Sequence, residues 1–465
     1  MMNILLDNLS FKRKEQFIFK QLNYGFHPGT FNILRGDSGC GKSTLLRIIA
    51  GFADLDYSGE VLLSGEKMRN KTIHEKASQI GMVFQNPNQQ FTMRTLRREI
   101  TFALENLSYS YEEIQRRMYH AVELTKTTHF LDQDLISLSG GEKQRASLTV
   151  LLAMNAPILL LDEPFASIDI KSRHELIALL AELRDLGKTI ILCDHDLSGY
   201  QGLVDQVVTL GKNGLSQENL SILDSQPVPI LSKKTEISSP LLQLNQVSYG
   251  HGKRILLEPT DYLFNQGITT LTGDNGVGKS TLLSAIVQQK KHKGKLYLNG
   301  KKIKRNKALY QQLTLAVQDA SHQFVQLTPR EELSFNTTLS EEQKKKQKEV
   351  LGRLGLADKL DGSLFHLSEG QKKMIQLVSM LSLDRELLLL DEPFTGLDEV
   401  ACQLFMDWMI EKSDKQSFII VSHRLAPLSG NSDYHVNLSH KTLSFVGEQI
   451  HQGGEIIECS QNQYA

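Results

Sequence analysis

The chain has 465 residues, which is more than one hydrophobic core usually serves and favours two or three domains. Its 52 lysines and arginines balance 53 acidic residues, and a net charge of -1 excludes a bulk field that would draw it to nucleic acid or an anionic membrane. Cys40, Cys193, Cys402 and Cys459 lie far apart, which excludes a disulfide framework, a zinc site and an iron–sulfur cluster, and favours a reducing cytoplasm.

Neither a secretory leader nor a membrane span is expected. The first 16 residues meet charge too early for a signal peptide, and no apolar run approaches the roughly 18 residues that a transmembrane helix needs. We therefore expect a soluble or membrane-peripheral protein.

The first functional motif of the first half is a glycine-rich loop. Residues 30–34 read as a strand, residues 36–43 (GDSGCGKS) match G-x-x-x-x-G-K-S, and a helix follows. Backbone N–H groups of such a loop surround phosphates, Lys42 reaches the β- and γ-phosphates, and the Ser43 hydroxyl binds magnesium. The expected ATP-binding residues are Gly36, Asp37, Ser38, Gly39, Cys40, Gly41, Lys42, Ser43 and Thr44.

Two carboxylates follow a continuous apolar run later in the first half. Residues 94–127 read as amphipathic helix, and residues 157–163 (PILLLDE) as a buried parallel strand that ends in Asp162 and Glu163. Two adjacent carboxylates at the end of a buried strand cost free energy unless they have a function. We therefore expect Asp162 to hold magnesium and Glu163 to polarise the attacking water. An α/β core with a helical insertion results.

The second half repeats the first in order and spacing. Its loop GDNGVGKS (273–280), helical region (329–359) and strand ELLLLDE (386–392) predict the same chemistry. Residues 225–240 contain three prolines and read as a linker between domains 1–224 and 241–465. The expected residues for ATP are Gly273, Asp274, Asn275, Gly276, Val277, Gly278, Lys279, Ser280 and Thr281, with Ser280 and Asp391 for magnesium and Glu392 for water.

LSGGEKQR (138–145) and LSEGQKKM (367–374) resemble the signature motif of ATP-binding cassette (ABC) ATPases. The resemblance implies two tandem P-loop NTPase domains of ABC type, each an α/β domain with a helical insertion subdomain. It also implies that each signature contacts the γ-phosphate held by the opposite domain. Site one would pair Lys42 with Ser368 and Gly370, and site two would pair Lys279 with Ser139 and Gly141.

The same resemblance implies roles for further matched pairs. His195 and His423 correspond to the switch histidine, and Asp169 and Asp398 to the D-loop. Gln85 and Gln318 correspond to the Q-loop glutamine, which touches magnesium and reports the nucleotide state to a partner.

Within this family, VFQNPNQQF (83–91) and AVQDASHQF (316–324) are similar to the Q-loops of energy-coupling factor transporter ATPases. The second copy departs, with Asp-Ala in place of Asn-Pro. The second signature departs too, because Glu369 replaces a glycine and Met374 replaces the arginine found as Arg145.

The adenine-stacking residue stays open. The positions that an aromatic residue usually occupies look like Arg13 and His251, and either side chain can stack on a base. Phe11 and Tyr249 are the neighbouring alternatives.

We expect an ATP-hydrolysing subunit of an energy-coupling factor-type importer of a vitamin or metal-type solute, using ATP and Mg²⁺ at the cytoplasmic face of the membrane. Its partners would be a transmembrane coupling protein and a substrate-binding component. The alternative, a double-cassette translation factor acting on ribosomes, is disfavoured because the linker is short and Pro-broken. The basic runs at 290–295 and 301–307 read as solvated faces, so no nucleic acid is expected.

Overall fold

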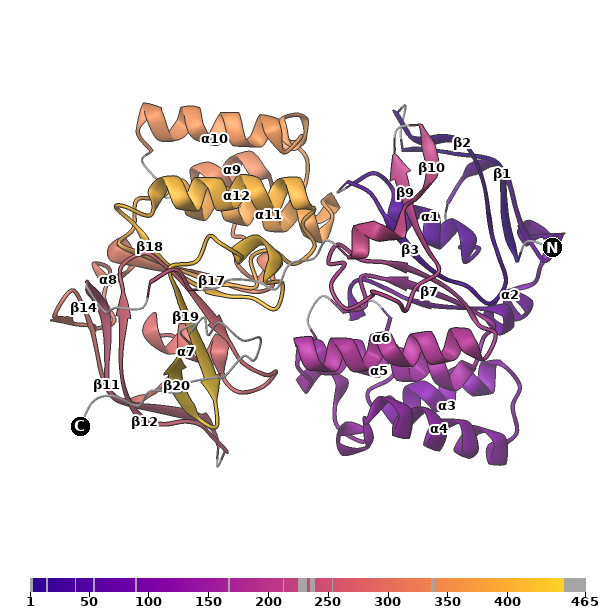
Figure 1. The fold of residues 1–465 in the computed structure, drawn as a ribbon, viewed down its shortest axis with the longest axis horizontal. Helices are drawn as coiled ribbons and strands as arrows, with labels where there is room; N and C mark the ends of the chain where they lie inside the picture. Colours follow the sequence, from indigo (N-terminus) through magenta and orange to yellow (C-terminus); the bar gives the residue numbers. More distant parts are fainter. Residues whose placement is uncertain are drawn as a thin grey trace. The chain divides into compact units, whose positions relative to one another are not determined.

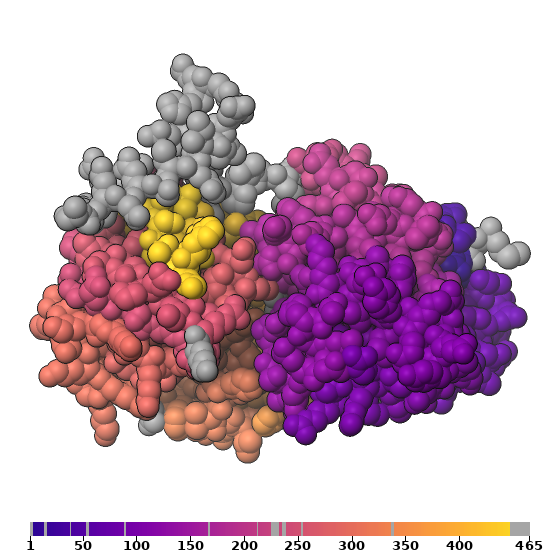
Figure 2. All heavy atoms as spheres, turned by 90° about the horizontal axis from the view of Figure 1, so that it is seen from below, coloured from indigo at the N-terminus to yellow at the C-terminus, as the bar shows by residue number. Residues whose placement is uncertain are grey.

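The structure is a computed structural model that describes residues 3–13, 16–37, 39–52, 55–87, 90–165, 168–211, 213–224, 232–234, 239–252, 254–335 and 339–446. Contacts divide the chain into two units, Met1–Gln226 and Pro227–Ala465. Each unit is built from one continuous half of the sequence, as the colours of Figure 2 show. Most of the predicted linker, together with Ser38 and Cys459, lies outside the described residues.

The first unit contains two sheets (Figure 1). An antiparallel sheet has the strand order β2-β1-β4-β5, with bounds Gln16–Phe26, Ile4–Arg13, Tyr57–Leu63 and Glu66–Lys67. The other has the order β10-β9-β3-β8-β7-β6, with bounds Gly214–Glu218, Gln206–Gly211, Phe31–Arg35, Thr189–Cys193, Ile158–Asp162 and Ile80–Val83. Strands β9, β3, β8, β7 and β6 pair in parallel, so their carboxyl ends meet at one edge.

The second unit repeats this plan. Its antiparallel sheet has the order β12-β11-β14-β15, with bounds Arg254–Asn265, Pro240–His251, Lys293–Leu298 and Lys301–Lys302. Its mostly parallel sheet has the order β16-β17-β18-β13-β19-β20, with bounds Leu313–Ala316, Leu387–Asp391, Ser417–Val421, Ile268–Thr272, Tyr434–Ser439 and Thr442–Phe445.

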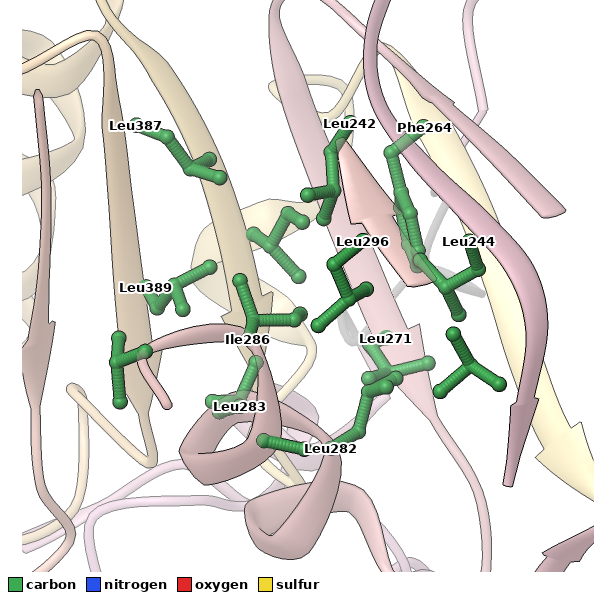
Figure 3. Packing of buried hydrophobic residues seen from close by; sticks show 14 of the residues in the cluster. Leu242, Leu244, Phe264, Leu271, Leu282, Leu283, Ile286, Leu296, Leu387 and Leu389 are labelled. Atoms are coloured by element: carbon green, nitrogen blue, oxygen red, sulfur yellow. The ribbon is translucent and has the colours of Figure 1, made fainter. Parts of the chain in front are cut away.

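The helix after each glycine-rich loop is buried between the two sheets. Helix α7 (Lys279–Ile286) directs Leu282, Leu283 and Ile286 into a core shared by both sheets of its unit (Figure 3). Helix α1 (Lys42–Ile49) packs in the same way in the first unit. Burial of these apolar faces holds the amino-terminal end of each helix directly behind its loop.

Each helical insertion is built of several helices rather than one. The predicted helix at 94–127 is divided into α3 (Leu96–Asn106) and α4 (Tyr111–Thr125), which pack with α5 (Gly140–Met154) at one end of the unit (Figure 1). Ser110 begins α4 as its N-cap. The second unit has α9 (Pro329–Ser334), α10 (Glu341–Arg353) and α11 (Glu369–Leu381) at the matching places.

The remaining helices are α2 (Ile73–Gln79), α6 (Ile170–Asp185), α8 (Leu309–Gln312) and α12 (Glu399–Lys412). None of the helices in the described part of the chain is long and apolar enough to cross a bilayer. The predicted α/β class with a helical insertion in each half is confirmed.

Candidate nucleotide-binding and catalytic sites

Both glycine-rich loops lie between a parallel strand and the start of a buried helix. Gly36 follows β3 with φ 149°, and Gly273 follows β13 with φ 144°. A Cβ at either residue would lie only 2.5 Å from the Leu210 carbonyl oxygen or 2.3 Å from that of Leu438. Glycine is therefore required by the approach of a neighbouring strand as well as by the backbone angle.

The lysine of each loop folds back over its own backbone. Lys42 Nζ donates hydrogen bonds to the carbonyl oxygens of Gly36 at 2.7 Å and Asp37 at 3.1 Å. Lys279 Nζ makes the matching bonds to Gly273 at 2.6 Å and Asp274 at 2.9 Å. Both ammonium groups thus lie at the mouth of the loop, where the helix N-terminus also favours an anion.

The predicted acidic pairs lie at the carboxyl ends of β7 and β17, and all four side chains are buried. Glu163 and Glu392 have left-handed backbones, with φ 47° and 50°. Such angles are strained for a residue with a long side chain, and strain of this kind collects at functional sites.

In the first unit, two of the predicted site residues contact Glu163. His195 Nε2 lies 3.1 Å from Glu163 Oε1, and Gln85 Nε2 donates to Oε2 at 3.0 Å. In the second unit His423 Nε2 lies 3.5 Å from Glu392 Oε1, and the His423 backbone N–H donates to Oε2 at 3.1 Å. The structure therefore brings Gln85 and Glu163, which are 78 positions apart in the sequence, into direct contact.

These contacts affect the two glutamates differently. Burial pushes the pKa of Glu163 upward, but the facing His195, together with Lys42 and Gln85, lowers it below its ordinary value. Burial raises the pKa of Glu392 to about 8, against the opposing hydrogen bond from the His423 backbone. The two candidate bases thus differ in the pH range over which they are ionised.

The aspartate of each pair is suited to a cation. Burial, aided by the charge of Glu163, raises the pKa of Asp162 to about 7, and burial also raises that of Asp391. The hydroxyl groups of Ser43 and Ser280 bond these carboxylates. Among the described residues, the buried Oδ1 atoms of Asp162 and Asp391 have no hydrogen-bond partner.

A serine and aspartate pair with an unsatisfied carboxylate oxygen fits magnesium, whose remaining ligands are usually phosphate and water oxygens. The described residues contain no cluster of three His, Cys, Asp or Glu side chains that could hold a metal. A cation at either loop would therefore depend on the nucleotide for several ligands.

Both signature serines cap a helix. Ser139 and Ser368 are the N-caps of α5 and α11, and each forms a capping box, with Glu142 or Gln371. Glu369, which replaces a glycine, pairs with Lys372 Nζ at 2.9 Å. Met374, which replaces the arginine, is buried in the core around α11. Gly141 and Gly370 lie in the first turn of these helices.

Sequence reasoning missed a lysine beside the second acidic pair. Lys373, only 4% exposed, donates to the carbonyl oxygens of Gln318 at 2.6 Å and Val317 at 3.3 Å. Burial lowers its pKa to about 8, while the charges of Asp391 and Glu392 oppose this shift. The first unit has Gln144 five residues after its signature serine, where the second has Lys373. The replacement of glutamine by lysine at this position is the feature of the sequence that could have revealed it.

The candidates for stacking on adenine differ in accessibility. Tyr249 is buried, and its hydroxyl donates to the Gly278 carbonyl at 3.1 Å, so it supports the loop from beneath. Phe11 is half-buried against the first core, whereas Arg13 and His251 are exposed. The choice among these four residues stays a prediction.

The D-loop aspartates are N-caps as well. Asp169 accepts from the Ser172 backbone at 2.9 Å at the start of α6, and Asp398 from that of Ala401 at 2.8 Å at the start of α12. These N-caps fix the residue at which each loop ends and its helix begins.

Comparison with known proteins agrees with this geometry. A family model described as "ABC transporter" matches residues 19–166 and 260–395. The chain therefore belongs to the ABC transporter family, with two ATP-binding cassettes, and it is an ATPase.

Relatives match nearly the whole chain. "Putative HMP/thiamine import ATP-binding protein YkoD" of Bacillus subtilis is 29% identical, over 95% of this chain and 90% of its own length. A "putative ABC transporter ATP-binding protein" of Sulfurisphaera tokodaii is 31% identical, over 84% of this chain and 86% of its own. The solved structure "RNase-L Inhibitor" covers 94% of this chain and 88% of its own, with a TM-score of 0.64 and 19% identity, which shows a shared double-cassette fold.

Proposed function

We propose that this protein is the ATP-hydrolysing subunit of an energy-coupling factor-type importer that moves a vitamin or metal-type solute through separate membrane subunits. The observation that carries the proposal is the direct bond between Gln85 and Glu163. It joins the candidate base to segment 85–91, whose sequence resembles the Q-loops of such importers. The name of the Bacillus subtilis relative, an HMP/thiamine import ATP-binding protein, supports a vitamin-type solute.

In the proposed reaction Glu163 and Glu392 accept a proton from the water that attacks the γ-phosphate. His195 and His423 hold these carboxylates in place from the adjacent strand ends. Lys42 and Lys279 bind the phosphates, and bound magnesium would neutralise charge on their β- and γ-oxygens. Ser43 with Asp162, and Ser280 with Asp391, would hold that ion, with Gln85 and Gln318 beside it.

Each complete site also needs the signature of the opposite cassette. We propose that Ser368 and Gly370 complete the site of Lys42, and that Ser139 and Gly141 complete that of Lys279. Closure on ATP would then be transmitted through segments 85–91 and 318–324 to a transmembrane coupling protein. A ligand can drive such a change only through contacts that differ between the two states, which γ-phosphate sensing provides.

Co-purification tests the proposal. The tagged full-length chain, expressed in its native host, is expected to sediment with membranes and to retain integral membrane proteins after detergent extraction. Mass spectrometry of those proteins would identify the solute-binding component. Sedimentation with ribosomes, at an ionic strength that removes loosely bound proteins, would instead support the translation-factor alternative and overturn the importer assignment.

A further inference from the structure

A buried arginine fixes the loop that carries His195. Arg173 of α6 is 6% exposed, and its Nη2 donates to Asp194 Oδ2 at 3.0 Å and to the Asp196 carbonyl at 2.6 Å. Its Nη1 donates to the Ser198 carbonyl and to Ser198 Oγ, the latter at 3.2 Å. One guanidinium thus bonds the residues immediately before and after His195, as well as a third residue of the same loop.

The loop is also closed on itself. The hydroxyl of the fully buried Tyr200 donates to Asp194 Oδ2 at 2.7 Å, and Asp194 Oδ1 accepts from the Asp196 backbone at 3.0 Å. Asp196 Oδ1 accepts from the Ser198 backbone at 2.9 Å and from its hydroxyl at 2.7 Å. A connected network of this kind leaves the loop little freedom, because moving one member breaks several buried bonds.

Arg173 also lies near the D-loop, taken as the segment from Phe165 to Asp169 in the first cassette and from Phe394 to Asp398 in the second. Its Cζ lies 5.9 Å from the ring centroid of Phe165, at the start of the segment that leads to Asp169, and 5.0 Å from that of Tyr200. The guanidinium therefore lies between the loop of His195 and the D-loop, within the distance range of cation–π contacts.

The second cassette places an arginine between the same two loops, but from the opposite side. Four residues after the D-loop aspartate, where the first cassette has Arg173, the second has the buried Cys402. Its arginine is instead Arg424, directly after His423, where the first cassette has Asp196. Arg424 Nη1 donates to the carbonyl oxygens of Phe394, at 3.3 Å, and Leu397, both in the D-loop.

Two further observations support the exchange. The charge of Arg424 acts on the Cys402 thiol, whose pKa is raised to about 11 by burial, so this guanidinium lies near the place that Arg173 occupies in the first cassette. Ser422 replaces Asp194 and no longer offers a carboxylate, and its hydroxyl and the Arg424 backbone bond each other instead. The arginine of the helix and both aspartates of the histidine loop are thus replaced together in the second cassette.

We propose that a single guanidinium positions the switch histidine against the candidate base in each cassette, supplied by helix α6 as Arg173 in the first and by the histidine loop as Arg424 in the second. Both arginines are positioning residues, because they act through His195 and His423. Each of these arginine clamps bonds residues of its own unit, so each controls hydrolysis at the site of its own cassette. The proposal rests on the roles proposed for Glu163 and Glu392.

The test measures Arg173→Met and Arg173→Lys in two backgrounds of the full-length chain. Glu392→Gln leaves the first cassette's base intact, and Glu163→Gln leaves that of the second. Arg173→Met is expected to lower kcat about tenfold in the Glu392→Gln background, with the KM for ATP changed by about twofold at most, because misplaced catalytic groups lose rate before binding. In the Glu163→Gln background its effect should stay within about twofold, and Arg173→Lys should recover part of the loss.

Arg424→Met is the matched control and should show the reverse dependence, lowering kcat mainly in the Glu163→Gln background. Tyr200→Phe removes the hydroxyl that donates to Asp194 and keeps the guanidinium. It supplies the test if Arg173→Met is misfolded, which the loss of cooperative unfolding would show. Equal fractional losses in both backgrounds, or losses confined to KM, would overturn the clamp. Turnover that persists in the Glu163→Gln, Glu392→Gln double variant would instead show that the candidate bases are wrong.

Discussion

Glu163 Oε1 lies 3.1 Å from His195 Nε2 in the first cassette, and Glu163 Oε2 accepts a second bond from Gln85. The matching histidine contact in the second cassette is longer, at 3.5 Å, and Glu392 Oε2 accepts a hydrogen bond from the His423 backbone N–H. Two sites built from the same motifs thus hold their candidate bases in different electrostatic surroundings. The difference has consequences for pH dependence and for the balance between sites.

The first prediction concerns pH. A base must be ionised to act, and the pKa of Glu392 is raised to about 8, so its activity should be lost as the pH falls below that value. The pKa of Glu163 is lowered, so this residue should stay ionised throughout the neutral range. In Glu163→Gln, which relies on Glu392, kcat/KM should rise on the order of tenfold between about pH 6.5 and pH 8.5.

The same profile in Glu392→Gln should be nearly flat, because it relies on Glu163. The profile of kcat/KM is the correct measurement, since it reports groups of the free enzyme. Ionisation of ATP itself affects both variants equally and cancels in their ratio. Parallel profiles would contradict the assigned difference between the two carboxyl groups.

The second prediction is that both glutamates together account for hydrolysis. Replacing both by glutamine keeps their size but removes the base, so turnover should fall by about 10²-fold or more. Binding of a fluorescent ATP analogue should persist, because Lys42 and Lys279 are unchanged. Turnover close to that of the unaltered chain would rule out these residues as the principal bases.

Much of the site follows from sequence, because its parts are attached to regular elements. A loop between a buried strand and a helix, and acids at the end of an apolar strand, are local patterns, and β3, β7 and their repeats confirm the strands. The break between α3 and α4 was missed, although Ser110 is a recognisable N-cap.

The tertiary partners could not be predicted in the same way. Arg173 meets Asp194 only after β8 and α6 pack together, and Lys373 meets the Val317 carbonyl only because α11 lies against the end of β16. Neither arginine nor lysine is an expected buried residue, so hydropathy predicts both on the surface. Comparing the two halves position by position would have marked both, since Cys402 and Gln144 replace them.

The third prediction is that the sites are unequal. The signature proposed to complete the first site carries Glu369, and carboxylate charge near a γ-phosphate should weaken closure there, although Lys372 offsets part of it. Glu392→Gln should therefore lose more activity than Glu163→Gln. The comparison belongs at about pH 8.5, where Glu392 is largely ionised and the pH effect does not obscure it.

Glu369→Gly supplies the matched control for this inequality. It restores the glycine found at Gly140 in the first signature. Added to Glu392→Gln, it should raise the remaining ATPase rate, and added to Glu163→Gln it should have little effect. Equal losses in the two single variants would show that the departures in the second signature are neutral.

The fourth prediction places the membrane partner against segments 85–91 and 318–324, with Phe91 and Phe324 as the expected anchors. Both phenylalanines are partly buried against the cores of their units, which leaves only part of each ring for a partner. Gln323 is engaged with Gln376 and the Val317 backbone, so a cysteine there would disturb the loop. Gln89, the corresponding crosslinking position before Phe91, lies outside the described residues.

Thr92 and Val325 are better crosslinking positions, because both follow the phenylalanines directly and both are exposed, Val325 by 65%. They are matched: the backbone N–H of each donates at 2.9 Å to a glutamate seven residues later. Cysteines at these positions, in a chain lacking Cys40, Cys193, Cys402 and Cys459, should crosslink to a co-expressed membrane subunit in a nucleotide-dependent manner. A cysteine at the exposed Ile73 serves as a control away from these segments and should not crosslink. If neither Thr92 nor Val325 crosslinks while the intact complex still hydrolyses ATP, the partner docks elsewhere and the phenylalanines serve only the cores of their units.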